Sequence, residues 1–174
     1  ELIAVASVFM HPELKGKNLA VITHAGGPAV MITDALSVAG MSVPPIAGDA
    51  ASELLGKLFP GSSVANPIDF LATGTAEQLG TIIDYTEKHF EHIDGMVVIF
   101  GTPGLFPVYE VYDVLDARMR TCRKPIFPVL PSILTAQDEV KAFISKGRIN
   151  FPDEVVLAHA LGKVFHASPP APAG

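Results

Sequence analysis

The chain has 174 residues, of which 49% are hydrophobic and only 17% charged, so it can build a core and is not an intrinsically disordered protein. Its net charge of -6, its isoelectric point near 5.4 and the absence of a basic cluster argue against nucleic-acid binding. No apolar run is long enough to cross a membrane, and the single cysteine, Cys122, excludes a disulfide framework and fits a cytoplasmic protein.

Short strands and helices are expected to alternate along the chain. Residues 1–12 predict a leading helix that joins the domain to something upstream, and the chain begins without Met, as expected of a piece of a longer protein. Apolar and β-branched runs predict five strands, at 19–23, 42–46, 96–100, 126–130 and 148–151. Apolar residues at helical spacing predict helices at 28–39, 75–88, 107–120, 135–146 and 153–166. The domain is expected over residues 13–167, followed by a Pro/Ala-rich linker over 168–174.

This alternation predicts an α/β fold built from βαβ units around a parallel sheet. Right-handed crossovers place helices on both faces of such a sheet. We therefore expect a three-layer α/β/α, flavodoxin-like domain with a five-stranded, doubly wound parallel sheet. Ligands of doubly wound sheets bind outside the carboxyl ends of the strands, so the turns that follow strands are the candidate binding sites.

The segment "THAGGPA" (23–29) follows the first strand. Gly26 and Gly27 allow a tight turn and the close approach of another group, and Pro28 fits the first helical turn, where its missing N–H costs nothing. Open amides and the positive end of the helix dipole favour an anion there. The spacing matches neither G-x-G-x-x-G nor a P-loop, so an ordinary tight turn without a ligand stays open as the alternative.

The segment "ANPIDFLATGTAEQ" (65–78) is a long polar approach to the next helix. Thr73 or Thr75 is expected to cap the helix that starts near residue 76, which by itself is an ordinary structural role. The rest of the approach leaves Asn66, Asp69 and Thr73 available to face a ligand.

A third turn, "FGTPGLFP" (100–107), follows the most apolar strand. Gly101 and Thr102 leave backbone amides open ahead of a helix. A purely structural loop would explain this turn alone, but three such turns at one sheet edge favour a shared anion site.

His24, at the end of the first strand, could serve as a base, a metal ligand or a phosphoryl acceptor. No second His or Cys stands at ligand spacing from it, so no metal site is expected. The other histidines, His11 among them, are expected to be solvated or to cap helix ends. Cationic neighbours could lower the pKa of Cys122, but an incidental, unreactive thiol is the favoured interpretation.

Four segments carry a family resemblance in a fixed order: "KGKNLAVITHAGGPAVMITDAL", "ANPIDFLATGTAEQL", "DGMVVIFGTPG" and "KPIFPVL". With them the sequence resembles the NDP-forming acyl-CoA synthetases, the superfamily of succinyl-CoA synthetase, ADP-forming acetyl-CoA synthetase and ATP-citrate lyase. The resemblance is to their second flavodoxin-like domain (domain 5), which is succinyl-CoA-ligase-like, and it extends from about Leu14 to Phe165.

The resemblance implies a reversible ligase reaction in which acyl-CoA, ADP and phosphate give acid, CoA and ATP through an acyl-phosphate and a phosphohistidine. It places that histidine in a neighbouring domain, so no catalytic residue is expected in this chain, and the chain alone is expected to be inactive. This domain would offer a helix N-terminus to the phosphohistidine and line the acyl or phosphate pocket. CoA, ADP or ATP, and Mg²⁺ are expected on the partner domains, which are a CoA-binding domain, a phosphohistidine domain and a downstream ATP-grasp domain.

The resemblance also assigns positions and shows two departures from the family pattern. His24 stands where the family has Asn, and Thr102-Pro103 stands where the succinate enzymes have Gly-Ile, so one donor amide is missing. The matched ligand-contacting positions are Gly26, Gly27, Asn66, residues 73–75, Gly101 and Thr102.

The departures leave open a second hypothesis, a non-catalytic ligand-binding or regulatory module that kept the fold. A flavin-binding or response-regulator protein is a third. The absence of Trp, of a Ser/Thr-rich phosphate loop and of a receiver-type acidic cluster argues against it.

Overall fold

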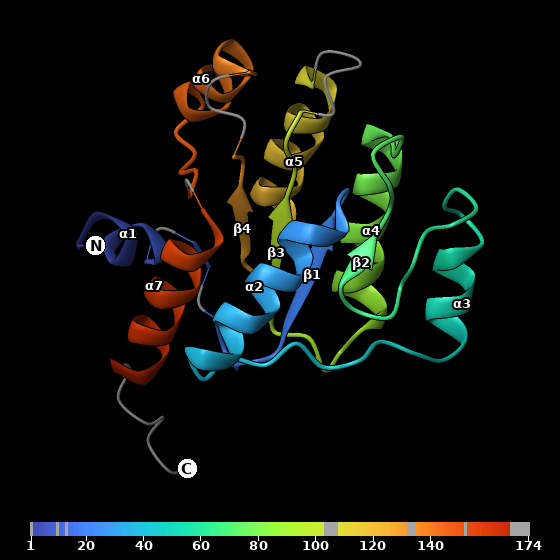
Figure 1. Cartoon of the computed structure of the whole chain (residues 1–174), viewed down its shortest axis with the longest axis horizontal. Coiled ribbons are helices and arrows are strands. Elements are labelled where there is room, and N and C mark those ends of the chain that lie inside the picture. Colours follow the sequence, from blue (N-terminus) through green and yellow to red (C-terminus); the bar gives the residue numbers. More distant parts are fainter. Residues whose placement is uncertain are drawn as a thin grey trace.

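The computed structural model describes residues 2–9, 11–12, 14–102, 108–131, 135–151 and 153–167. The linker predicted at 168–174 lies outside these residues. The described elements, in chain order, are α1 (Leu2–Val8), β1 (Leu19–Thr23), α2 (Gly26–Val38), α3 (Asp49–Leu55), β2 (Ile68–Asp69), α4 (Ala76–His89), β3 (Gly95–Ile99), α5 (Tyr109–Thr121), β4 (Ile126–Val129), α6 (Gln137–Ser145) and α7 (Glu154–Ala167) (Figure 1).

The strands form one parallel sheet in the order β2-β1-β3-β4. Every residue of β1 and β3 is buried, because helices cover both faces of the sheet. The crossover from β2 back past β1 to β3 makes the sheet doubly wound. The predicted α/β fold with a parallel sheet is therefore confirmed.

Two of the five predicted strands are reduced to single bridges, so the strand count was wrong. Segment 42–46 contributes only a parallel bridge between Ser42 and Asn18, and its two prolines have no N–H to donate to a ladder. Segment 148–151 contributes only the parallel bridge of Phe151 to Val129, in the place where a fifth strand would continue the sheet. Conversely, α3 and the two-residue β2 were not predicted.

Two apolar clusters pack against the two faces of the sheet. Leu19 and Val21 point toward α1, α2 and α7, whereas Ala20 and Ile22 point toward α3, α4, α5 and α6. Figure 1 shows α2 and α7 lying together over the near face, with α1 beside α7. Gly162 lets α7 approach α2 closely, since a Cβ there would lie 2.7 Å from the Ala39 carbonyl oxygen.

Within the described ranges no helix has both the length and the apolar character needed to traverse a bilayer.

Candidate functional site

The turns that follow β1, β2 and β3 meet at the carboxyl edge of the sheet. The Phe70 N–H donates to the Thr23 carbonyl oxygen at 3.1 Å, which joins the first two turns. The His24 ring lies 4.4 Å from the Phe100 ring, centroid to centroid, and Phe70 stacks on Phe100 at 5.9 Å. The structure thus brings the three turns together over a floor of two phenylalanines.

In the first turn of α2, two backbone amides have no partner among the residues that the structure describes. Its N-cap, Ala25, supplies no side-chain cap, and the Ala25 N–H itself donates to Thr23 Oγ1 at 3.1 Å. Pro28 has no N–H, so the Gly26 and Gly27 amides are the open donors, and neither bonds to any other described residue. Both glycines are exposed. This is the geometry in which a helix N-terminus can accept an anion.

His24 is half-buried beside this turn, and its Nδ1 is buried without a hydrogen-bond partner in the described part of the chain. Burial lowers the pKa of His24, and this effect outweighs the Ile99 carbonyl and the Asp69 carboxylate, which both raise it. The imidazole is therefore neutral at neutral pH. It can donate or accept a hydrogen bond at the site but brings no positive charge.

Asp69 places a carboxylate at the start of α2. Its Oδ1 accepts the Leu71 N–H at 2.9 Å, and its Oδ2 lies 3.8 Å from where a Cβ on Gly26 would be. Leu71 sits at φ 69°, a left-handed conformation that is unfavourable for leucine. This negative charge already complements the helix dipole, and it opposes a second anion at the Gly26 end of the turn.

The two threonines before α4 differ in their surroundings. The Thr75 hydroxyl accepts the Gln78 N–H, and Gln78 Oε1 accepts the Thr75 N–H, both at 3.2 Å, which is a complete capping box. The predicted cap is thus confirmed for Thr75. Thr73 is exposed.

Asn66 lies within the sheet edge, below the carboxyl ends of the strands. Its Oδ1 accepts the Val21 N–H at 2.9 Å, and its Nδ2 donates to the carbonyl oxygens of Leu19 and Pro44 at 3.0 and 2.8 Å. The side chain thereby replaces the backbone partners that a longer β2 would give β1. We assign Asn66 this structural role, and the acyl contact implied by the resemblance stays a prediction.

The turn after β3 is described only in part. Gly101 is buried and Thr102 partly exposed, whereas Pro103 and Gly104 lie outside the described residues. The Phe100 ring packs beneath the site, against His24 and Phe70. The buried Tyr112 hydroxyl donates to the Phe100 carbonyl oxygen at 3.1 Å. Sequence reasoning did not single out Phe100. The signal was an aromatic residue at the last position of an otherwise aliphatic strand.

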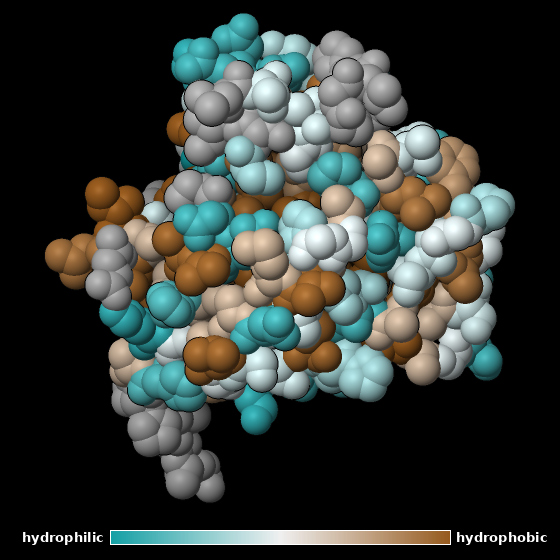
Figure 2. Space-filling view, viewed as in Figure 1, coloured by the Kyte–Doolittle hydropathy of each residue, from teal (hydrophilic) through white to brown (hydrophobic). Residues whose placement is uncertain are grey.

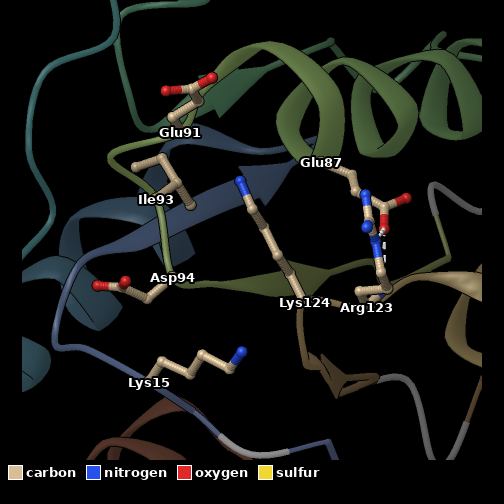
Figure 3. A pocket seen from close by; sticks show the side chains of 7 residues that line it. All are labelled: Lys15, Glu87, Glu91, Ile93, Asp94, Arg123 and Lys124. Atoms are coloured by element: carbon tan, nitrogen blue, oxygen red, sulfur yellow. Dashed lines mark hydrogen bonds and ion pairs between the residues drawn. The ribbon is translucent and has the colours of Figure 1, made fainter.

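A hollow of about 310 Å³ lies at the opposite, amino edge of the sheet (Figure 3). Two of its charged lining residues make hydrogen bonds to the backbone that stabilise the fold. Lys124 Nζ donates to the last carbonyls of α4, those of Thr86 and Phe90, and the Asp94 carboxylate accepts the Asn18 N–H. Three acidic and three basic side chains balance there, so the hollow has no marked preference for a charged ligand. The lining residues are Lys15, Glu87, Glu91, Ile93, Asp94, Arg123 and Lys124.

Cys122 is buried, and burial raises the pKa of its thiol to about 11. The lowering of this pKa that the cationic neighbours suggested is therefore not found, and the burial agrees with an unreactive thiol, because the thiolate is the reactive form. Among the described residues, no three His, Cys, Asp or Glu side chains are placed to hold a metal ion.

Comparison with known proteins gives one partial sequence match and several structural neighbours. No protein-family model matches the chain. The chain is 32% identical over 77 residues to the acetate–CoA ligase [ADP-forming] II subunit alpha of Pyrococcus furiosus, a match over 44% of this chain and 17% of that protein. PH0766 from Pyrococcus horikoshii superposes over 95% of this chain and 39% of its own, with a TM-score of 0.84 and 21% identity. A dinucleotide-forming acetyl-coenzyme A synthetase from Ca. Korarchaeum cryptofilum covers 89% of this chain and 34% of its own, with a TM-score of 0.75 and 19% identity.

The solved structures, at 21% and 19% identity, share the α/β fold of this chain. The partial sequence match and the shared fold are both consistent with the family resemblance of the sequence. The chain spans well under half the length of each of these proteins, which are 17%, 39% and 34% covered.

Proposed function

We propose that this chain is one domain of an NDP-forming acyl-CoA synthetase and that the carboxyl edge of its sheet binds an anionic reaction partner. The observation that carries the proposal is the first turn of α2, where the Gly26 and Gly27 amides have no partner among the described residues. α4 offers a contrast, since a side chain satisfies its N-terminus. A ligand that supplies acceptor oxygens would complete α2 as Thr75 completes α4.

The ligand would be a phosphoryl group or a small carboxylate, as the family reaction requires. Backbone amides fixed in a helix can stabilise the charge of a phosphoryl group without rearranging during transfer. The neutral His24 would contribute a hydrogen bond from the side, and Phe70 and Phe100 would exclude water from below. The phosphohistidine, CoA, the nucleotide and Mg²⁺ would belong to other domains of the same protein, and a cytoplasmic location fits this chemistry.

Deleting one amide tests the site directly. Gly26→Pro removes the N–H at the first helical position, where proline is well tolerated, and the preceding Ala25 already has the extended conformation that proline demands. Gly26→Ala is the matched control, because it keeps the N–H and its Cβ has room. Calorimetric titration with inorganic phosphate should show weaker binding for Gly26→Pro and unchanged binding for Gly26→Ala.

Removing the charge of Asp69 should act in the opposite direction. Asp69→Asn keeps the Oδ1 that accepts the Leu71 N–H and removes the negative charge next to α2, so it should tighten phosphate binding. If phosphate binding is the same in the parent protein, Gly26→Pro and Asp69→Asn, the anion does not bind at this edge. In the full-length protein, ATP formation from ADP, phosphate and an acyl-CoA would test the ligase reaction itself.

A further inference from the structure

The helices over one face of the sheet, α1, α2 and α7, expose apolar side chains where a polar surface is usual. α1 has no charged residue, and the 13 residues of α2 contain one, Asp34. A helix that is apolar on all sides is normally covered on all sides. We call this surface the α1–α2–α7 face; its exposed large apolar side chains are Leu2, Ile3, Val30, Met31, Val38 and Val155.

The exposure of these side chains is high on α1 and α2. Val38 on α2 and Ile3 on α1 keep 85% and 84% of their surface accessible, whereas Val155 on α7 keeps 43%, the same as Leu55 on α3. Figure 2 shows brown, hydrophobic side chains over α2 in the middle of this face and over α1 at its left, with hydrophilic ones between them. Large exposed apolar areas with a polar surround mark surfaces that bind another protein body.

We propose that the α1–α2–α7 face docks a neighbouring domain of the same protein; this rests on the proposed function, in which the chain is one domain of a longer synthetase. The structures that it resembles continue well beyond it, since the chain covers 39% and 34% of them. Figure 1 shows α1 and the end of α7 on the same side of the molecule. Segments that precede α1 or follow α7 in a longer protein therefore leave the domain beside this face.

The chemistry of the face defines the surface that fits it. Asp34 is the one charge on the outer side of α2, and it makes no ion pair with another described residue. The docking surface should therefore be apolar over α1 and α2, with one Lys, Arg or backbone N–H opposite Asp34, and polar over α7, which exposes His159, Lys163 and His166. Because α2 begins at Gly26, a domain docked along it also borders the candidate anion site. Docking would then deliver the reacting group to that edge.

Cysteine footprinting tests the docking surface. The native Cys122 is buried with its pKa raised to about 11, so it contributes little background to maleimide labelling. Val30→Cys and Val38→Cys place thiols on the face, and Lys88→Cys and Ala117→Cys place exposed control thiols on α4 and α5, away from the carboxyl edge of the sheet. Each variant is labelled in the chain alone and in the full-length protein, and the modified peptides are quantified by mass spectrometry.

The proposal expects the two face thiols to label readily in the chain alone and to lose labelling in the full-length protein, while the two control thiols label in both. Equal labelling of the face thiols in both proteins overturns it. Protection already present in the chain alone, together with a dimeric mass by sedimentation, makes a second copy the occupant and also overturns it. The footprint is independent of the ligase assay, so protection without ATP formation would remove the proposed function and leave the docking face standing.

Discussion

The two helical layers of this domain bury similar apolar side chains against the sheet, but they differ in the side chains that they expose. α4 buries Leu79 and Ile82 against the sheet, and its outer side is charged, with Asp84 paired to Arg118 of α5 at 2.8 Å. α2 buries Ile32 and Leu36 equally well, but the large side chains on its outer side are apolar and Asp34 is its one charge. The sheet thus dictates only the inner side of a helix, and the outer side shows whether the helix meets water or another protein surface.

The largest predicted loss of stability comes from truncating a leucine on the sheet-facing side of a helix. This loss should be equal in the two helical layers. Leu36 and Leu79 are both 0% exposed, so Leu36→Ala and Leu79→Ala should each lower the free energy of unfolding by about 2–5 kcal/mol. Urea denaturation measures both. A much smaller loss for Leu36→Ala would mean that the α2 layer is loosely packed in the isolated domain. It would contradict the statement that both layers pack equally well against the sheet.

Lowering the pH should destabilise the part of the domain next to α1. The ring of His11 packs on Phe127 at 4.8 Å, and its Nε2 is buried without a partner in the described structure. Burial, with a smaller contribution from Arg148, lowers the pKa of His11 from 6.5 to about 4. The folded state then binds fewer protons than the unfolded state between these values, so stability is complete above pH 6.5 and falls toward pH 4.

This loss should reach about 3 kcal/mol at most. Chemical denaturation at a series of pH values measures it, and His11→Phe, which keeps an aromatic ring against Phe127, should abolish most of it. Hydrogen exchange should show the first acid-induced opening at α1 and α7, not at α4 and α5. Opening that begins at α4 would contradict the assignment to His11.

Close packing between α2 and α7 predicts an effect of intermediate size. A Cβ on Gly162 would lie 2.7 Å from the Ala39 carbonyl oxygen, so Gly162→Ala should cost about 1–3 kcal/mol of stability. Gly56 follows α3 in the opposite layer at φ -63°, and a Cβ there meets nothing closer than 3.4 Å. Gly56→Ala is therefore the control and should be neutral or slightly stabilising in the same thermal unfolding assay.

The smallest predicted loss of stability comes from removing the side chain that caps the start of α4. Thr75→Ala removes the α4 cap and should cost about 1 kcal/mol. Thr73→Ala, two residues earlier and exposed, should change stability by less than about 0.5 kcal/mol. Equal losses for the two threonines, measured by urea denaturation, would show that the capping box does not stabilise the start of α4.

Much of the fold follows from local sequence signals. The runs at 19–23 and 96–100 are continuously apolar, which is why β1 and β3 were predicted almost to the residue. Thr75 followed by Gln78 is a capping signal that needs no tertiary information. The turns after 19–23 and 96–100 could be placed at one edge because parallel strands end on the same side, whereas the turn in 65–78 follows β2, which was not predicted.

The remaining features depend on contacts between distant segments. Asn66 was interpreted as ligand-facing, but it bonds to Leu19 and Val21, more than 40 residues earlier in the chain. His11 was expected to be solvated or to cap a helix, yet Phe127 and Phe151 enclose it from segments that no local pattern connects to it. The apolar outer side of α2 was visible in the sequence, but only the fold shows which residues point outward.

The amide of Asn66 has a consequence for the behaviour of this protein at high concentration. Together with the Ser42 carbonyl oxygen, which accepts the Leu19 N–H, it leaves the lower half of β1 no unpaired main-chain group on that side. Unpaired strand flanks are templates onto which other chains add in fibrils. The Asn66 side chain and the Ser42 carbonyl oxygen thus occupy the flank of a fully buried strand that the two-residue β2 is too short to cover, so this flank is not open to the addition of another chain.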